Sequence, residues 1–142
     1  MMEVTEISEG IVLDHITSGN GLKIFDKLNL AAVDQPVVLL MSVPSVRLTK
    51  KDIIKIQNIR DLDLAMVGLI DPGITVNIIE GGKIISKYRV EIPREVRGLF
   101  QCGNPRCVTN SDTYVEPRFT LVNAETKEYA CEYCEEITRY RV

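Results

Sequence analysis

The sequence Cys102-Gly103-Asn104-Pro105-Arg106-Cys107 is followed, 23 residues later, by Cys131-Glu132-Tyr133-Cys134. These motifs contain all four cysteines of the chain, in the spacing C-x4-C-x23-C-x2-C. A pair of cysteines separated by two to four residues lets one turn present two thiolates to one ion, and zinc favours four tetrahedral ligands. We therefore predict one structural zinc ion, bound by Cys102, Cys107, Cys131 and Cys134.

Two other readings of these cysteines remain open: thiol redox chemistry and an iron–sulfur centre. A redox C-x-x-C motif normally opens a helix in a βαβ context, whereas Cys131 follows a strand-like run. A catalytic zinc ion is disfavoured because four thiolates leave no position for water, and the single histidine, His15, is far away in sequence. Residues 93–142 also have too little apolar content to form a stable core alone, so a metal is needed to hold them together.

A change in composition divides the chain into two parts. The first hundred residues are rich in Ile, Val and Leu and contain no cysteine, and Ile92-Pro93-Arg94 marks the joint. Proline at this position disfavours helix for the residue before it and removes a backbone donor. We predict two domains, 1–92 and 93–142.

The first domain alternates strand-like and helix-like patterns. We expect strands over 4–7, 10–13, 37–43, 51–57, 74–79 and 83–90, a helix over 21–30, and a second helix capped by Asp61 and stopped by Asp71-Pro72-Gly73. Pro44-Ser45 and Glu80-Gly81-Gly82 are read as turns. The segment 51–57 is ambiguous, because Thr49-Lys50-Lys51-Asp52 resembles a capping box, but its three isoleucines favour a strand.

This order predicts an α+β fold, a ferredoxin-like α/β sandwich with an antiparallel sheet and helices on one face. The second domain has strand-like stretches at 119–122 and 129–130 and no helical period. We expect a small all-β zinc domain.

Charge and hydropathy exclude several classes of protein. The net charge is -3, and residues 93–142 carry seven basic and eight acidic side chains, whereas a phosphate-binding face needs a positive surplus. No apolar run reaches the ~18 residues of a membrane helix, and the N-terminus does not resemble a signal peptide. We expect a cytoplasmic protein that binds neither nucleic acid nor membrane, with its second domain contacting another protein.

The sequence resembles the regulatory chain of aspartate carbamoyltransferase along nearly its whole length. The resemblance rests on residues 10–16, 51–56 and 65–77 and on the two cysteine motifs, in which the C-x4-C pair is uncommon among zinc ribbons. It implies a chain without catalysis of its own that acts in pyrimidine biosynthesis. The N-terminal domain would bind CTP as inhibitor and ATP as activator, with UTP in some members. The C-terminal zinc domain would dock on the catalytic chain, and regulatory homodimers would link catalytic trimers.

The resemblance also implies a nucleotide site. Its positions are Ile7, Val12, Asp14, His15, Lys51, Lys55, Asn77, Ile79, Ile84 and Lys87. The lysines would meet ribose and phosphates, Ile79 and Ile84 would wall the base pocket, and Asp14, His15 and Asn77 would bind sugar or base groups. No P-loop or G-x-G-x-x-G motif is present, so side chains would hold the phosphates.

Two alternatives come from other functional classes. One is a nucleic-acid-binding zinc ribbon fused to an α+β domain, which the charge disfavours. The other is a small enzyme that uses His15 with Asp14 on nucleotides, whose signature would be steady hydrolysis of CTP or ATP by the isolated chain.

Overall fold

The structure, a computed structural model, describes residues 6–141 and divides the chain into two compact units. One unit ends at Glu91 and the other begins at Ile92. None of the helices within 6–141 has the length and apolar character needed to cross a bilayer.

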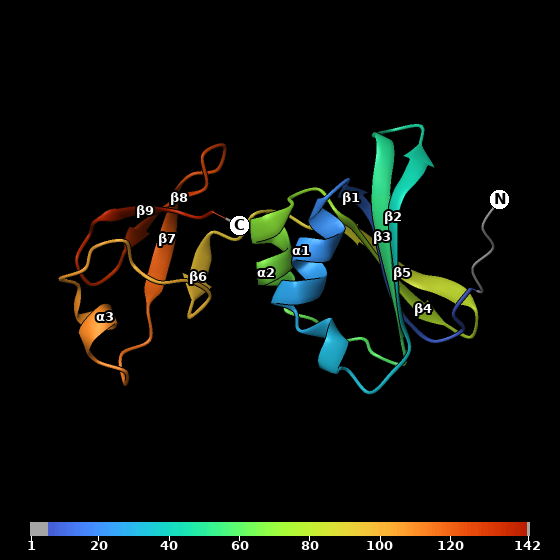
Figure 1. Cartoon of the computed structure of the whole chain (residues 1–142), viewed down its shortest axis with the longest axis horizontal. Coiled ribbons are helices and arrows are strands. Elements are labelled where there is room, and N and C mark those ends of the chain that lie inside the picture. The colour runs from blue at the N-terminus through green and yellow to red at the C-terminus, as the bar shows by residue number, and fades with distance from the viewer. Residues whose placement is uncertain (1–5, 142) are drawn as a thin grey trace. The chain divides into compact units, whose positions relative to one another are not determined.

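The first unit is a five-stranded antiparallel sheet with two helices on one face (Figure 1). Its elements are β1 (Gly10–Thr17), α1 (Asn20–Lys27), the 3-10 helix η1 (Leu30–Ala32), β2 (Val37–Ser45), β3 (Thr49–Gln57), α2 (Leu64–Ile70), β4 (Thr75–Glu80) and β5 (Lys83–Arg89). The strand order is β2-β3-β1-β4-β5, and every neighbouring pair is antiparallel. The predicted α+β fold is confirmed, with β5 added at one edge of the ferredoxin-like arrangement.

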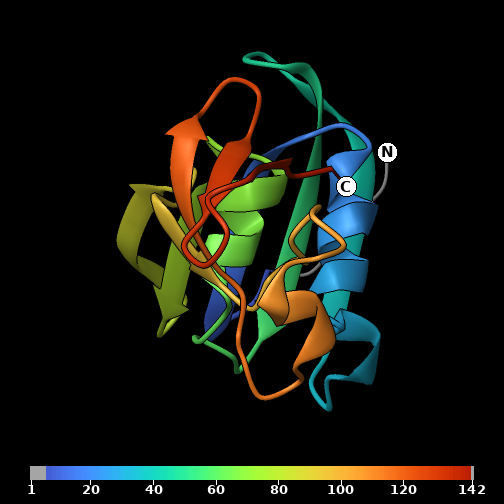
Figure 2. The same ribbon diagram turned by 90° about the vertical axis from the view of Figure 1, so that its left-hand side faces the viewer.

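Strand alternation gives this sheet one buried face and one open face. Ile11, Leu13, Ile54, Ile56 and Val76 are at most 1% exposed and form a core with apolar side chains of α1 and α2. The residues between them in the chain lie on the opposite face, because successive side chains of a strand point to opposite sides. The turn between β2 and β3 projects beyond the rest of the sheet in both views (Figure 2).

A buried carboxylate ties the start of α1 to two strands. Asp52 of β3 is 0% exposed and accepts hydrogen bonds from the backbone N–H groups of Gly19 (2.9 Å), Gly21 (3.0 Å) and Ser42 (2.9 Å). Gly19, at the N-cap of α1, has no side chain to cap the helix, so Asp52 supplies the acceptor. A Cβ atom on Gly21 would lie 2.7 Å from Cβ of Asp52, which explains why glycine stands there.

Several predicted boundaries in this unit were wrong. The expected strand over 4–7 lies partly outside the described residues, and Glu6 and Ile7 are irregular. Pro44 belongs to β2 rather than to a turn, because an edge strand tolerates proline. The cap of α2 is Asp63, which accepts from Met66 N–H at 3.2 Å, and not Asp61.

One further boundary differs, and one ambiguous segment is resolved. The helix predicted over 21–30 stops at Lys27, since Asn29 adopts a left-handed conformation (φ 53°). The ambiguous segment 51–57 lies in strand β3, as expected.

The second unit is a small antiparallel sheet over an aromatic core. Its elements are β6 (Glu95–Arg97), α3 (Val108–Ser111), β7 (Arg118–Asn123), β8 (Glu128–Cys131) and β9 (Ile137–Arg139), with strand order β6-β7-β8-β9. The Phe100 ring stacks on Phe119 with centroids 4.3 Å apart and meets Tyr129 and Tyr140 at 5.5 and 5.4 Å. Burial raises the pKa of Tyr129 to about 12. The expectation of no helix in this unit was wrong by the four residues of α3.

Candidate functional site

The four cysteines converge in the second unit from separate turns. Cys102 precedes the first turn, Cys107 stands immediately before α3, Cys131 ends β8, and Cys134 follows in the next turn. All four Sγ atoms lie within 4.8 Å of one another. The distances are 3.6 Å for Cys102–Cys134 and 3.7 Å for Cys107–Cys131. A tetrahedron of thiolates around zinc, with Zn–S of about 2.3 Å, has edges of about 3.8 Å, so this donor set fits a four-coordinate metal.

Hydrogen bonds preform the turns that carry these thiols. The Asn110 side chain donates to the carbonyls of Cys102 (2.9 Å) and Asn104 (2.7 Å), which fixes the first turn. The second turn is closed by the Glu135 N–H donating to the Cys131 carbonyl at 2.9 Å. Burial raises the pKa of Cys102 to about 12, whereas hydrogen bonding from Thr109 lowers the pKa of Cys107 to about 7. A metal that binds here displaces protons, because thiolates are the ligands.

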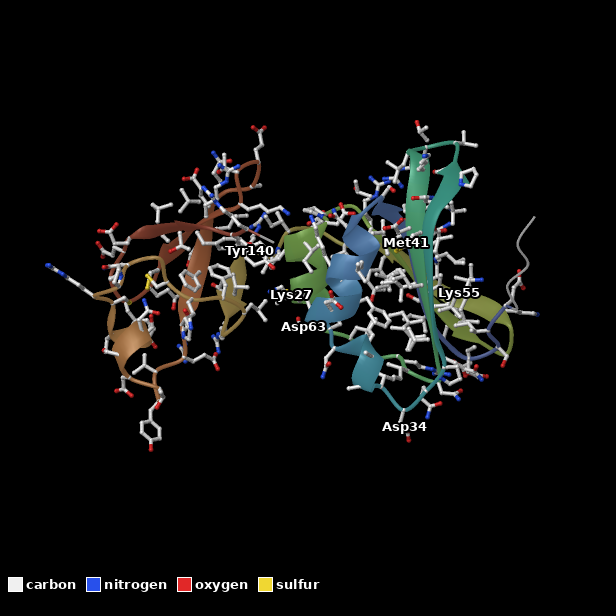
Figure 3. All side chains as sticks on the ribbon, in the orientation of Figure 1. Lys27, Asp34, Met41, Lys55, Asp63 and Tyr140 are labelled. Atoms are coloured by element: carbon white, nitrogen blue, oxygen red, sulfur yellow. The ribbon has the colours of Figure 1, made fainter. Side chains whose placement is uncertain are left out.

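A separate groove of about 350 Å³ lies on the open face of the first unit's sheet. Seven predicted nucleotide contacts line it: Ile7, Val12, Asp14, Lys55, Asn77, Ile79 and Ile84. The strand register explains this convergence, since Lys55 on β3 pairs with Val12 on β1, which pairs with Asn77 on β4. Lys87 on β5 continues the same row as the partner of Asn77. Figure 3 shows Lys55 on the side of the sheet away from α1.

Charges at one end of the groove are paired in a small network. Lys51 Nζ lies 3.0 Å from Asp14 Oδ1, which also accepts the backbone N–H of His15 at 2.6 Å. Burial alone raises the pKa of Asp14, but the hydrogen bonds from Lys51 and His15 outweigh it, and the net pKa is lowered. Asp14 is therefore an anion at neutral pH, and Lys51 keeps a hydrogen-bonded partner in the free chain.

His15 does not line the groove. It sits in a β-bulge of β1 with φ 60°, and its Nδ1 lies 3.0 Å from Thr75 Oγ1. Burial lowers the pKa of His15, and the positive charges of Lys51, Arg47 and Lys87 act in the same direction against the opposing effect of Asp14. The imidazole is therefore uncharged at neutral pH, although the Asp14 carboxylate lies close to it.

One buried acceptor in the groove lacks a partner. Asn77 is 7% exposed, and its Oδ1 atom has no hydrogen-bond partner within the described residues. Buried amide oxygens are normally satisfied, so this atom suits a ligand that donates a hydrogen bond.

Sequence reasoning missed three residues that line the groove: Glu6, Ile53 and Gly82. Ile53 could have been predicted from strand alternation, because it lies between Lys51 and Lys55 on the same face of β3. Glu6 and Gly82 come from irregular segments and gave no periodic signal.

Comparison with known proteins matches both units. The profile described as "Aspartate carbamoyltransferase regulatory chain, allosteric domain" covers residues 2–91, and that of the metal binding domain covers 94–142. The aspartate carbamoyltransferase regulatory chains of Clostridium acetobutylicum and Clostridium tetani are 48% and 50% identical over 137 and 138 residues, covering 96% of this chain and 94% and 96% of theirs. That of Bifidobacterium longum is 39% identical over 135 residues, covering 95% and 97%.

These matches extend over nearly the full length of each relative and confirm the resemblance found in the sequence. The chain therefore belongs to the family of aspartate carbamoyltransferase regulatory chains, the non-catalytic subunits of an enzyme of pyrimidine biosynthesis.

Proposed function

We propose that the chain senses nucleoside triphosphates and adjusts the activity of aspartate carbamoyltransferase catalytic chains. CTP, ATP and, as in some members of the family, UTP would bind the groove of residues 1–92. Residues 93–142 would dock on the catalytic chain, and homodimers of this chain would link catalytic trimers. The single observation that carries this proposal is the groove, where Lys55, Asn77 and Asp14 line one cavity with a cation and hydrogen-bonding groups. Lys51 does not line the cavity but is paired with Asp14 at 3.0 Å.

The groove suits reversible binding of a triphosphate. Lys55 and Lys87 flank Val12 and Asn77 in one row across the sheet, so the cations reach a common ligand from two strands. Ile79 and Ile84 are register partners and offer an apolar wall for a base. A nucleotide that binds one quaternary state of the assembly more tightly shifts the equilibrium towards that state, typically by about 1–3 kcal/mol.

We further propose zinc as the metal, with one ion per chain and a structural role. Four thiols at near-tetrahedral spacing favour zinc and leave no open position for catalysis. Elemental analysis of the purified chain tests this directly, since an equivalent of iron in place of zinc would contradict it. Thiols kept for a metal rather than for disulfides suit a reducing compartment, and we place the chain in the cytoplasm on that ground.

Lys55→Ala should weaken nucleotide binding about tenfold, because a charge-assisted hydrogen bond to a phosphate or ribose oxygen is lost. The measurement is calorimetric titration of CTP, ATP and UTP into the complex reconstituted with catalytic trimers. Lys27→Ala is the matched control, since Lys27 lies on α1, on the far side of the sheet from Lys55 (Figure 3).

Each outcome of this titration has a defined meaning. Equal affinities for Lys55→Ala and Lys27→Ala would remove the groove from the proposal. Absence of heat with all three nucleotides in the wild-type complex would overturn nucleotide sensing itself. Steady hydrolysis of CTP or ATP would instead favour the enzymatic alternative.

A further inference from the structure

The connector between the two units is held firmly by the first unit. The Val90 N–H donates to the Ile74 carbonyl at 2.8 Å, and the Val90 carbonyl accepts from Gly73 at 2.7 Å. The next residue, Glu91, passes directly over α2, because a Cβ atom on Gly68 would lie 2.3 Å from the Glu91 carbonyl oxygen. The first unit therefore fixes the connector as far as Glu91.

The second unit holds the other end of the connector through a side chain. Tyr129 Oη donates to the Pro93 carbonyl at 2.6 Å, and the next carbonyl, of Arg94, accepts from the Leu121 N–H at 2.8 Å. β6 begins at the following residue. Only Ile92 lies between the two held stretches, and the proline after it restricts Ile92 to extended conformations.

Tyr129 links the backbone of the connector to the core of the metal-binding unit. It is 0% exposed, its ring lies against Phe100 in the aromatic core, and it stands on β8 two residues before the metal-binding Cys131. A buried tyrosine hydroxyl normally finds a polar partner, and here the partner is the connector's own backbone. The hydroxyl thus joins the connector to the buried aromatic core of the metal-binding unit.

We propose that Tyr129 is a positioning residue that fixes where the connector leaves the metal-binding unit, and that the effector response depends on this hydrogen bond. The inference rests on the proposed function. A displacement that starts in the nucleotide unit reaches the metal-binding unit along the chain through Glu91, Ile92 and Pro93. If the Pro93 carbonyl loses its donor, the connector gains local freedom, and part of that displacement is absorbed before it reaches β6.

Tyr129→Phe tests this role because it removes one hydroxyl and keeps the ring in the core. The variant is assembled with catalytic trimers, and the aspartate concentration at half-saturation is measured with and without CTP and ATP. We expect the nucleotide-induced shift to shrink by roughly two- to tenfold, the range for one buried hydrogen bond. Nucleotide affinity and metal content should stay at wild-type values, which separates loss of coupling from loss of structure. Tyr114→Phe, at a side chain that is 97% exposed, is the matched control.

A second variant keeps the test valid if Tyr129→Phe fails to fold. Pro93→Gly leaves Tyr129 in place and relaxes the connector directly, so it should reduce the response in the same direction even if Tyr129→Phe loses its metal. Wild-type response in Pro93→Gly, or in a metal-replete Tyr129→Phe, overturns the role of this connection. If the wild-type complex responds to no nucleotide, the proposed function fails and this role fails with it.

Discussion

Removal of the metal should unfold the second unit and leave the first unit folded. The unit is a small sheet whose core is four aromatic rings, and structural zinc in small modules contributes on the order of 10 kcal/mol of apparent binding free energy. That is comparable with the whole net stability of a typical folded domain, about 5–15 kcal/mol. The first unit has its own buried core of strand and helix side chains and needs no metal.

The measurement is a pair of two-dimensional NMR spectra of the full chain, before and after treatment with a chelator. The amide resonances of residues 92–141 should move to the chemical shifts of an unfolded chain. Those of β1, β3 and β4 should keep their positions. Since every cysteine of the chain belongs to the cluster, no neutral cysteine offers a control, and recovery on adding zinc but not magnesium takes its place. Association with catalytic trimers should vanish with the metal. If the amide resonances of the second unit stay dispersed without metal, the structural role of the metal is contradicted.

Asp52→Ala should destabilise the first unit by about 3–5 kcal/mol. The substitution removes the acceptor of three backbone N–H groups, those of Gly19, Gly21 and Ser42. The Gly21 donor is buried and costs roughly 1–3 kcal/mol when unsatisfied. Gly19 and Ser42 are exposed residues, so water can replace the acceptor and each loses only the net worth of one hydrogen bond, about 1 kcal/mol.

Urea unfolding of the zinc-saturated chain, followed by circular dichroism, measures this effect. Asp34→Ala is the matched control, because Asp34 is an exposed aspartate of the same unit. Asp52→Asn should fall between the two, since the amide keeps one acceptor oxygen but turns an NH2 group towards backbone donors. A loss in Asp52→Ala no larger than in Asp34→Ala would show that these hydrogen bonds contribute little.

The parts of the fold that the sequence predicted are those with local signals. Short runs of apolar and β-branched residues bounded by turn signals located every strand from β1 to β5, and the short spacing within each cysteine pair predicted the metal cluster. The contacts of Asp52 had no such signal. In the sequence Lys51-Asp52-Ile53, Asp52 looks like an ordinary polar residue of a strand. The backbone N–H groups that donate hydrogen bonds to it belong to residues 10 to 33 positions away.

The groove could likewise be predicted only in part. The residues carried over from the family lie together because β3, β1 and β4 are neighbours in the sheet, but the pairing register that aligns Lys55 with Val12 and Asn77 is a tertiary property. The bulge at His15 shifts that side chain out of the groove, and no local sequence pattern predicted the bulge. In the second unit, β6 and β9 have three residues each, too few for alternation to be detected.

The aromatic core has a consequence for how the chain is observed by optical methods. The sequence has no tryptophan and five tyrosines, of which only Tyr88 lies in the first unit. Tyr129 and Tyr140 are buried in the core that the metal holds, whereas Tyr88 is 41% exposed on β5. Tyrosine emission and near-ultraviolet dichroism of the unlabelled chain therefore report almost entirely on the metal-binding unit, which gives that unit an intrinsic spectroscopic probe.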